Sequence, residues 1–343
     1  MLALAAVLAL TPGPQGVLER AGAFTTFCMP FAVALAFWGA GRTPAGRSGP
    51  GVAAALTAGV LAAGVIATAV GQAIVGNSDT GSLFSNATGA AEGNLVTFPF
   101  TVPLAGLILV IMLQITLVWR KWPFAGLSPL AGGLAALATS WVLGIGAYAL
   151  LVNWDVVPAA ARDALGLRNP GGPVAPLDLL AFGFCVVVWQ VVVFHLLDGW
   201  PVTALRSAGA YLLAANALTL GGGYLTWLAL DSGLDRTPPE IIAAAAAGAA
   251  GVFITSLLFD GWPAKLSART GGAVAALLGL ATAWSVAIGY ALWGLGNWTE
   301  DWTRQPVQLW AAIVALNVIG GLVLLHVRVW HRWPTPAAPE PEG

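Results

Sequence analysis

The sequence predicts an all-α integral membrane protein with about nine transmembrane helices, arranged as tandem, parallel two-helix repeats. Two observations carry this prediction. First, 58% of the residues are hydrophobic, only 8% are charged, and the mean hydropathy is +0.82. A soluble domain contains about 25% charged residues, so this chain cannot present an ordinary aqueous surface. Second, four long apolar segments each run into a Trp-Pro pair, at Trp122, Trp200, Trp262 and Trp333.

The Trp-Pro pairs recur at intervals of 78, 62 and 71 residues, which indicates an internal repeat of about 70 residues. The second helix of the repeat has a pattern of its own, because Trp141 precedes Gly146 and Trp284 precedes Gly289, by five residues each time. All repeats run in the same direction, unlike the inverted repeats of many ion-coupled transporters. We therefore expect the hairpins to be related by rotation about an axis close to the membrane normal.

The apolar segments are long enough to cross a hydrocarbon core of about 30 Å. The nine expected helices span residues 21–40, 51–75, 95–119, 129–152, 177–197, 208–230, 241–259, 271–293 and 308–330. They form a single membrane domain (21–333) of repeated hairpins (21–75, 95–152, 177–230 and 241–293), with a half-repeat (308–333) at its end. Residues 1–20 are expected to be an apolar stub and loop, and residues 334–343 a Pro-rich tail. Proline in the first turn, as at Pro176, Pro239 and Pro306, is typical of helix starts.

The charges separate between the two sets of loops. The Trp-Pro side holds nine of the fourteen Lys and Arg residues, and the opposite side holds eleven of the fifteen acidic residues. Basic loops stay in the cytoplasm by the positive-inside rule. We therefore expect a multi-pass protein of the plasma (inner) membrane, with its N-terminus outside and its C-terminus in the cytoplasm. The sixteen tryptophans, far more than the four tyrosines, suit helix ends that lie among headgroups.

Uncharged polar residues lie within the expected spans, where no Asp, Glu, Lys or Arg is close to the middle. One interpretation is that they form interhelical hydrogen bonds. The other is that they line a polar path, with charged residues at its cytoplasmic rim. The candidates for the path or rim are Gln114, Gln190, Asn216, Asn317, His195, Asp198 and Asp260.

Asp198 and Asp260 each precede Gly-Trp-Pro at the end of an apolar segment, on the otherwise basic side. An anion is unfavourable at a helix C-terminus, so these residues need a reason to be there. We expect each carboxylate to shape a turn by accepting backbone N–H groups and pairing with a nearby cation. Arg206 is the expected partner of the first carboxylate, and Lys265 or Arg269 that of the second. A charged cytoplasmic rim is the alternative.

His195 and His326 lie at comparable depth near the ends of two expected helices. Two such histidines could ligate a haem. The default expectation is an interfacial histidine that pairs with Asp198 or a carbonyl group, and no cofactor is predicted. No catalytic group stands out, no metal-ligand spacing occurs, and the net charge of −1 gives no reason to expect a nucleic acid partner.

Two functions remain open. The first is a permease or channel-like protein for a neutral or weakly charged solute. The second is a non-catalytic membrane subunit of a larger respiratory or ABC-type complex, for which the partners would be the bilayer and another membrane protein or a second copy. An enzyme is the least favoured class, because no nucleophile, acid–base pair or metal cluster is evident. The sequence does not identify a substrate.

Overall fold

The computed structural model describes residues 13–39, 49–76, 98–259, 271–299, 301–302 and 306–332. In these residues the chain is helical, with one isolated β-bridge between Val152 and Val174. Eight helices are long and apolar enough to cross a membrane, and a ninth apolar helix, Val102–Val118, is shorter. The protein is thus a multi-pass, all-α membrane protein, as the sequence predicts. The count of nine crossings and the hairpin repeat stay predictions.

Five of the helical segments form an inner ring. They are α2 (Gly13–Ala34) with η1 (Leu35–Gly39), α4 (Val102–Leu113) with η4 (Gln114–Val118), α7 (Pro176–Val191) with η5 (Val192–Leu196), α10 (Pro238–Phe253) with η9 (Ile254–Leu258), and α13 (Val307–Ile313) with η10 (Val314–Gly320) and α14 (Gly321–Arg328). Each packs against the next in this order, and α13 packs back against α2, so the ring is closed. The η segments are π-helical, and each inner helix contains one.

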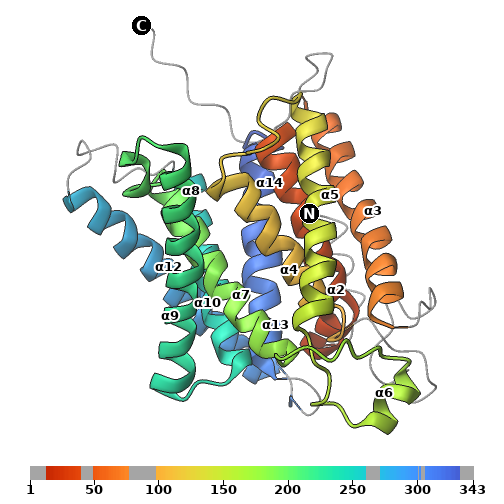
Figure 1. Ribbon diagram of the computed structural model, residues 1–343. Coiled ribbons are helices and arrows are strands. Elements are labelled where there is room, and N and C mark those ends of the chain that lie inside the picture. Colours follow the sequence, from red (N-terminus) through yellow and green to blue (C-terminus); the bar gives the residue numbers. More distant parts are fainter. Residues whose placement is uncertain are drawn as a thin grey trace, which may run out of the picture.

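Four helical segments form an outer layer around this ring. They are α3 (Pro50–Val75), α5 (Pro129–Leu151), the run α8 (Ala208–Asn216), η7 (Ala217–Gly221), α9 (Gly222–Leu228) and η8 (Ala229–Gly233), and α12 (Gly271–Thr299). Each packs against the inner helix that precedes it in the chain: α3 on α2, α5 on α4, α9 on α7 and α12 on α10. Figure 1 shows the inner helices between α3 and α5 on one side and α9 and α12 on the other.

Burial separates the two layers. Between 50 and 72% of the residues are buried in the spans of α2, α7, α10 and α13–α14, against 17 to 28% in those of the outer helices. Most of the surface of the outer helices is therefore not covered by other parts of the protein. In a membrane this surface contacts lipid, which is as apolar as the protein interior.

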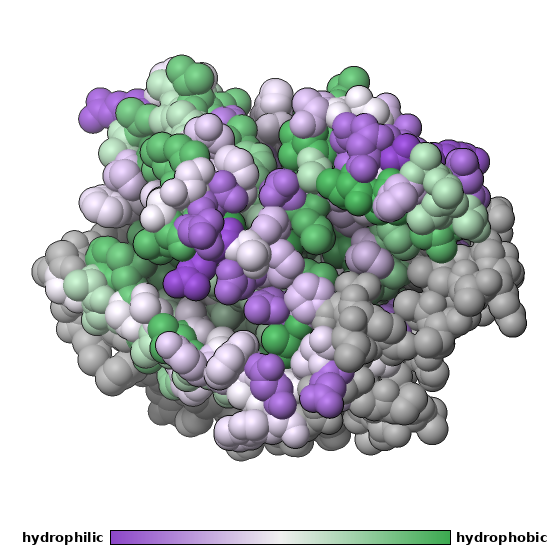
Figure 2. All heavy atoms as spheres, turned by 90° about the horizontal axis from the view of Figure 1, so that it is seen from below, coloured by the Kyte–Doolittle hydropathy of each residue, from purple (hydrophilic) through white to green (hydrophobic). Residues whose placement is uncertain are grey.

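The two ends of the bundle differ. A short helix, α6 (Ala159–Leu165), lies in the loop between α5 and α7 and marks one end, the lower end in Figure 1. Figure 2 looks onto this α6 end and shows hydrophilic side chains near the middle of the face and at its edges, interspersed with hydrophobic ones. The inner helices finish at the opposite end, next to the Trp-Pro pairs, which we call the Trp-Pro end. The 3₁₀ turn η6 (Val202–Ala204) follows the second of these pairs.

Three inner helices end in the same way at the Trp-Pro end. In each, two successive residues adopt a positive φ immediately before Trp or Trp-Pro, and the second donates its N–H to the carbonyl six residues back, at 2.8 to 3.0 Å. This i→i−6 hydrogen bond satisfies a carbonyl that the helix end would leave free. The residue pairs are Arg120–Lys121, Asp198–Gly199 and His331–Arg332. The turn at Trp262 lies outside the described residues.

The observed boundaries correct part of the expected organisation. Helix α2 begins at Gly13, so the expected stub and loop over 1–20 is helical in its last eight residues. The third expected helix, 95–119, begins later, at Val102, because residues 98–100 form a turn before it. The expected tail over 334–343 lies outside the described residues.

Candidate functional site

A cavity of about 490 Å³ lies at the Trp-Pro end of the inner ring, and we call it the vestibule. It is formed by the final turns of three inner helices, η1, η4 and η5, and by the turns that follow η4 and η5. Its polar lining residues are Thr116, Arg120, Lys121, His195 and Asp198. The remaining lining residues are Phe37, Leu117, Phe194 and Gly199.

Two basic side chains of the vestibule lie over aromatic rings. The guanidinium carbon of Arg120 is 5.2 Å from the ring centre of Tyr211, and the Lys121 ammonium nitrogen is 5.2 Å from that of Trp38. Such cation–π contacts hold a charge in place without neutralising it. Both residues also have a positive φ, which directs their side chains away from the helix path. The turn that ends α4 therefore places two fixed positive charges on the vestibule wall.

His195 forms part of the same wall. Its ring packs between Phe37 and Phe253, with ring centres 5.5 and 5.7 Å away. The Nε2 atom has almost no contact with solvent and no hydrogen-bond partner among the described residues. A further cation is close, since the guanidinium carbon of Arg328 lies 5.8 Å from the ring centre of Phe37. His195 thus brings a polar atom to a mainly aromatic part of the wall, where nothing in the described chain pairs with it.

Asp198 does not behave as the sequence predicts. Its side chain is exposed, and within the described ranges it makes neither a hydrogen bond nor an ion pair with Arg206 or any other cation. What the turn uses is its backbone, at φ 51°, a conformation that Asp tolerates better than most residues. The expected pairing of Asp198 with Arg206 is therefore wrong. Asp260, Lys265 and Arg269 lie outside the described residues.

Gln114, Gln190 and Asn216 come together in one hydrogen-bonded network. Gln190 Nε2 donates to Gln114 Oε1 at 2.7 Å, and Gln114 Nε2 donates to Asn216 Oδ1 at 2.8 Å. Trp119 Nε1 also donates to Asn216 Oδ1, at 3.1 Å. These bonds join η4, α7 and the outer helix α8 at one site. The first bond joins two inner helices, and the bonds to Asn216 join the inner and outer layers.

The other two candidates of the sequence lie elsewhere. Asn317 Nδ2 donates to Thr26 Oγ1 at 2.9 Å and to Thr25 Oγ1 at 3.2 Å, which joins η10 to α2. His326 lies in α14 and is not part of the vestibule lining, so the structure does not place it with His195 there. Among the described residues, no group of three or more His, Cys, Asp or Glu could hold a metal ion.

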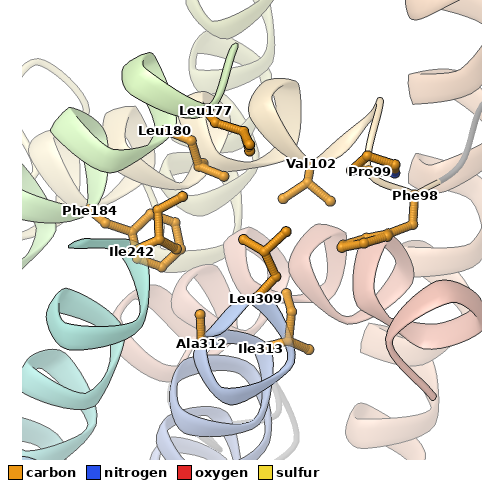
Figure 3. A pocket seen from close by; sticks show the side chains of 10 residues that line it. All are labelled: Phe98, Pro99, Val102, Leu177, Leu180, Phe184, Ile242, Leu309, Ala312 and Ile313. Atoms are coloured by element: carbon orange, nitrogen blue, oxygen red, sulfur yellow. The ribbon is translucent and has the colours of Figure 1, made fainter. Parts of the chain in front are cut away.

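Near the α6 end of the ring, apolar side chains from four inner helices converge. They surround a cavity of only about 20 Å³, which is just large enough for a water molecule. Figure 3 shows Leu180 and Phe184 of α7, Ile242 of α10 and Leu309 of α13 around it, together with Val102 of α4. We call these five residues the apolar closure.

Sequence reasoning missed one recurring contact, in which a tryptophan of the inner ring donates its indole N–H to a threonine hydroxyl of a neighbouring helix. The distances are 2.9 to 3.0 Å. The pairs are Trp38–Thr116, Trp189–Thr226 and Trp330–Thr57. Tryptophan was expected to anchor helix ends in headgroups, and Trp122 and Trp200 are indeed more than half exposed. No spacing in the sequence predicts these Trp–Thr hydrogen bonds, because each joins residues at least 37 positions apart.

No protein family, no curated protein and no solved structure matches this chain.

Proposed function

We propose that the protein is a permease or channel-like transport protein whose conduit follows the axis of the inner ring. One observation carries the proposal. A closed ring of five helices has a polar vestibule at one end, formed by three of its helices, and a closure of apolar side chains near the other end. In this form of the molecule the conduit is shut at the α6 end.

The charged residues of the vestibule support the proposal. A protein that only needed to stay in the membrane could bury its polar groups between helices, as the Gln114 network does. The vestibule instead keeps Arg120, Lys121 and Asp198 at a cavity without an ion pair among them. Charged side chains gathered at the mouth of a cavity raise or lower the local concentration of a charged solute.

The π-helical segments support it as well. Those of α2, α4 and α7 form the vestibule walls, and η10 interrupts the fifth inner helix near its middle. π-helical turns are rare and often lie at functional sites, because the extra residue re-aims side chains and weakens the helix ladder locally. The basic loops at the Trp-Pro end further suggest that the vestibule opens to the cytoplasm.

The test is solute uptake by proteoliposomes that contain the purified full-length protein. Stopped-flow light scattering follows the entry of a panel of small solutes, namely glycerol, urea, acetate and phosphate. We expect at least one to enter faster than into liposomes without protein. Uptake of all four at the rate of empty liposomes, from vesicles shown to contain folded protein, would contradict the proposal.

A second candidate is a non-catalytic subunit of a larger membrane complex, and helix α12 favours it. Large aromatic side chains are exposed along this outer helix: Tyr290 at 73%, Trp293 at 54% and Trp298 at 87%. Aromatic residues are enriched at protein–protein interfaces as well as at lipid headgroups. Purification from native membranes in a mild detergent separates the two functions, since a subunit is recovered with a stoichiometric partner and a permease is not.

A further inference from the structure

We propose that the vestibule binds a small oxyanion of the carboxylate or phosphate type, held by the cations Arg120 and Lys121 and by a hydrogen bond from His195. The inference rests on the proposed function, since it names the class of solute that enters the conduit. It narrows the neutral or weakly charged solute that the sequence predicts to a negatively charged one.

The charge of the vestibule wall is the first argument. Arg120 and Lys121 contribute two positive charges to the lining and Asp198 one negative charge, which leaves one net positive charge. Arg328 adds another nearby, over the ring of Phe37. None of these groups forms an ion pair with another described residue. A wall with a net positive charge attracts anions and repels cations of the same size.

The donor geometry is the second argument. Arginine presents a planar fork of N–H groups that matches the two oxygens of a carboxylate or phosphate. The Arg120 fork cannot turn freely, because it lies over the Tyr211 ring while its backbone is held in the left-handed region. Lys121 is fixed in the same way over Trp38. The entropy of ordering these long side chains is therefore lost on folding and need not be lost again on binding.

His195 supplies the third argument. A buried polar atom without a partner costs free energy, and native proteins rarely leave one without a reason. Nε2 of His195 is such an atom, on the vestibule wall, and the rings of Phe37 and Phe253 fix its position. In the neutral ring with its proton on Nε2, this N–H can donate to an anion oxygen once one of the two flanking rings moves aside. Together with Arg120 and Lys121, this donor completes a site that combines two charges with one directed hydrogen bond.

Binding of radiolabelled phosphate and acetate to the purified full-length protein tests the inference without requiring transport. The protein is placed in nanodiscs of phosphatidylcholine and assayed by scintillation proximity. We expect saturable binding of at least one of the two anions, displaced by unlabelled acetate but not by acetamide, its neutral isostere. Failure of both anions to bind saturably would overturn the inference, as would equal displacement by acetamide.

Substitutions test which side chains bind the anion. Arg120→Gln and Lys121→Gln each remove one charge, and His195→Phe removes the nitrogen while keeping a ring between Phe37 and Phe253. We expect each to lower the affinity about tenfold or more, as for a lost hydrogen bond to a charged group. The matched control is Arg206→Gln, which removes an exposed charge at the same end but outside the lining. Affinity that survives all three substitutions, or falls equally in the control, would contradict the assignment.

The outcomes separate this inference from the proposed function. Saturable anion binding without uptake by proteoliposomes supports the oxyanion site and argues against transport. Uptake of glycerol or urea without anion binding supports transport and overturns the oxyanion site. A repeat in nanodiscs that contain phosphatidylglycerol identifies the source of the anion, because competition by this lipid points to a headgroup and its failure to compete points to a soluble anion.

Discussion

At the scale of single residues, polar side chains in this protein have two distinct roles. Gln114, Gln190 and Asn216 form hydrogen bonds with one another between helices, although Gln190 Oε1 has no partner among the described residues, whereas Arg120, Lys121 and Asp198 line a cavity. Sequence alone gives no sign of this division, because all six lie in or beside apolar segments. What separates them is whether the fold brings a complementary group within hydrogen-bond distance.

The glutamine network should be measurable as stability. Gln114→Leu leaves Asn216 Oδ1 without its 2.8 Å donor and Gln190 Nε2 without the acceptor at 2.7 Å. We expect a loss of about 1–2 kcal/mol in the free energy of unfolding, followed by SDS titration in mixed micelles. Thr282→Ala is the control, since the hydroxyl of Thr282 is exposed and bonds only within its own helix. Equal stability of the two variants would show that the network contributes nothing.

The turn before Trp200 allows a second prediction, based on the φ of 51° at Asp198. Asp198→Asn keeps a residue that tolerates this conformation, and no described group pairs with the carboxylate, so the stability should change by less than about 0.5 kcal/mol. Asp198→Val introduces a β-branched residue and should cost about 1–2 kcal/mol. Thermal unfolding monitored by tryptophan fluorescence compares the two. If Asn is as harmful as Val, the carboxylate itself holds the turn.

At the scale of elements, glycine is what lets the outer helices approach the inner ones. A Cβ on Gly144 of α5 would clash with Ile108 of α4, and a Cβ on Gly223 of α9 would clash with Val186 of α7. In both cases the backbone of the inner helix is also within 3.3 Å of the added atom. Small residues at such contacts allow close backbone packing in lipid, where no hydrophobic effect drives helices together.

Two glycines on the same helix test this packing. Gly144→Ala should destabilise the protein by about 1–3 kcal/mol, because the added methyl forces α5 away from α4. Gly146→Ala, two residues along, meets nothing within 4 Å and should be neutral or stabilising by up to about 1 kcal/mol, from helix propensity. Unfolding in SDS measures both variants. A loss that is the same at both positions would mean that the α4–α5 contact is not set by glycine.

At the scale of the whole molecule, the sequence predicted the class of fold but not its layers. The hydropathy of the inner and outer spans overlaps, at 2.3 for Pro176–Leu196 and 2.0 for Pro50–Val75, although 67% of the first and 28% of the second are buried. A helix facing lipid and one facing protein need the same apolar side chains. The sequence offered His195 and Asp198 as candidates for a polar rim, but it did not predict the cavity itself, since Phe37 and Lys121 meet them only when the ring closes.

The orientation of the molecule remains a prediction from its basic loops, and two single cysteines can test it. Gly126 is exposed near the Trp-Pro end, and a side chain there would meet nothing within 4 Å. Ala160 is exposed in α6. The two variants are Gly126→Cys and Ala160→Cys. The native Cys28 and Cys185 are buried, so their background labelling should be low. In intact cells we expect an impermeant maleimide to label Ala160→Cys, and Gly126→Cys only after permeabilisation. The reverse pattern would place the vestibule outside.

The central claim is that the axis of the inner ring is a conduit shut by the apolar closure, and widening that closure tests it most directly. Phe184 is 4% exposed and projects into the small cavity from α7.

Uptake of acetate and phosphate by proteoliposomes is measured for the wild type, for Phe184→Ala and for a control, Leu213→Ala. Leu213 lies on the outer surface of α8 and is 75% exposed. All three proteins are first shown to be folded by size-exclusion chromatography. We predict uptake several-fold faster through Phe184→Ala than through the wild type, with Leu213→Ala unchanged. Uptake by folded Phe184→Ala that stays at the rate of empty liposomes would contradict a conduit through the ring.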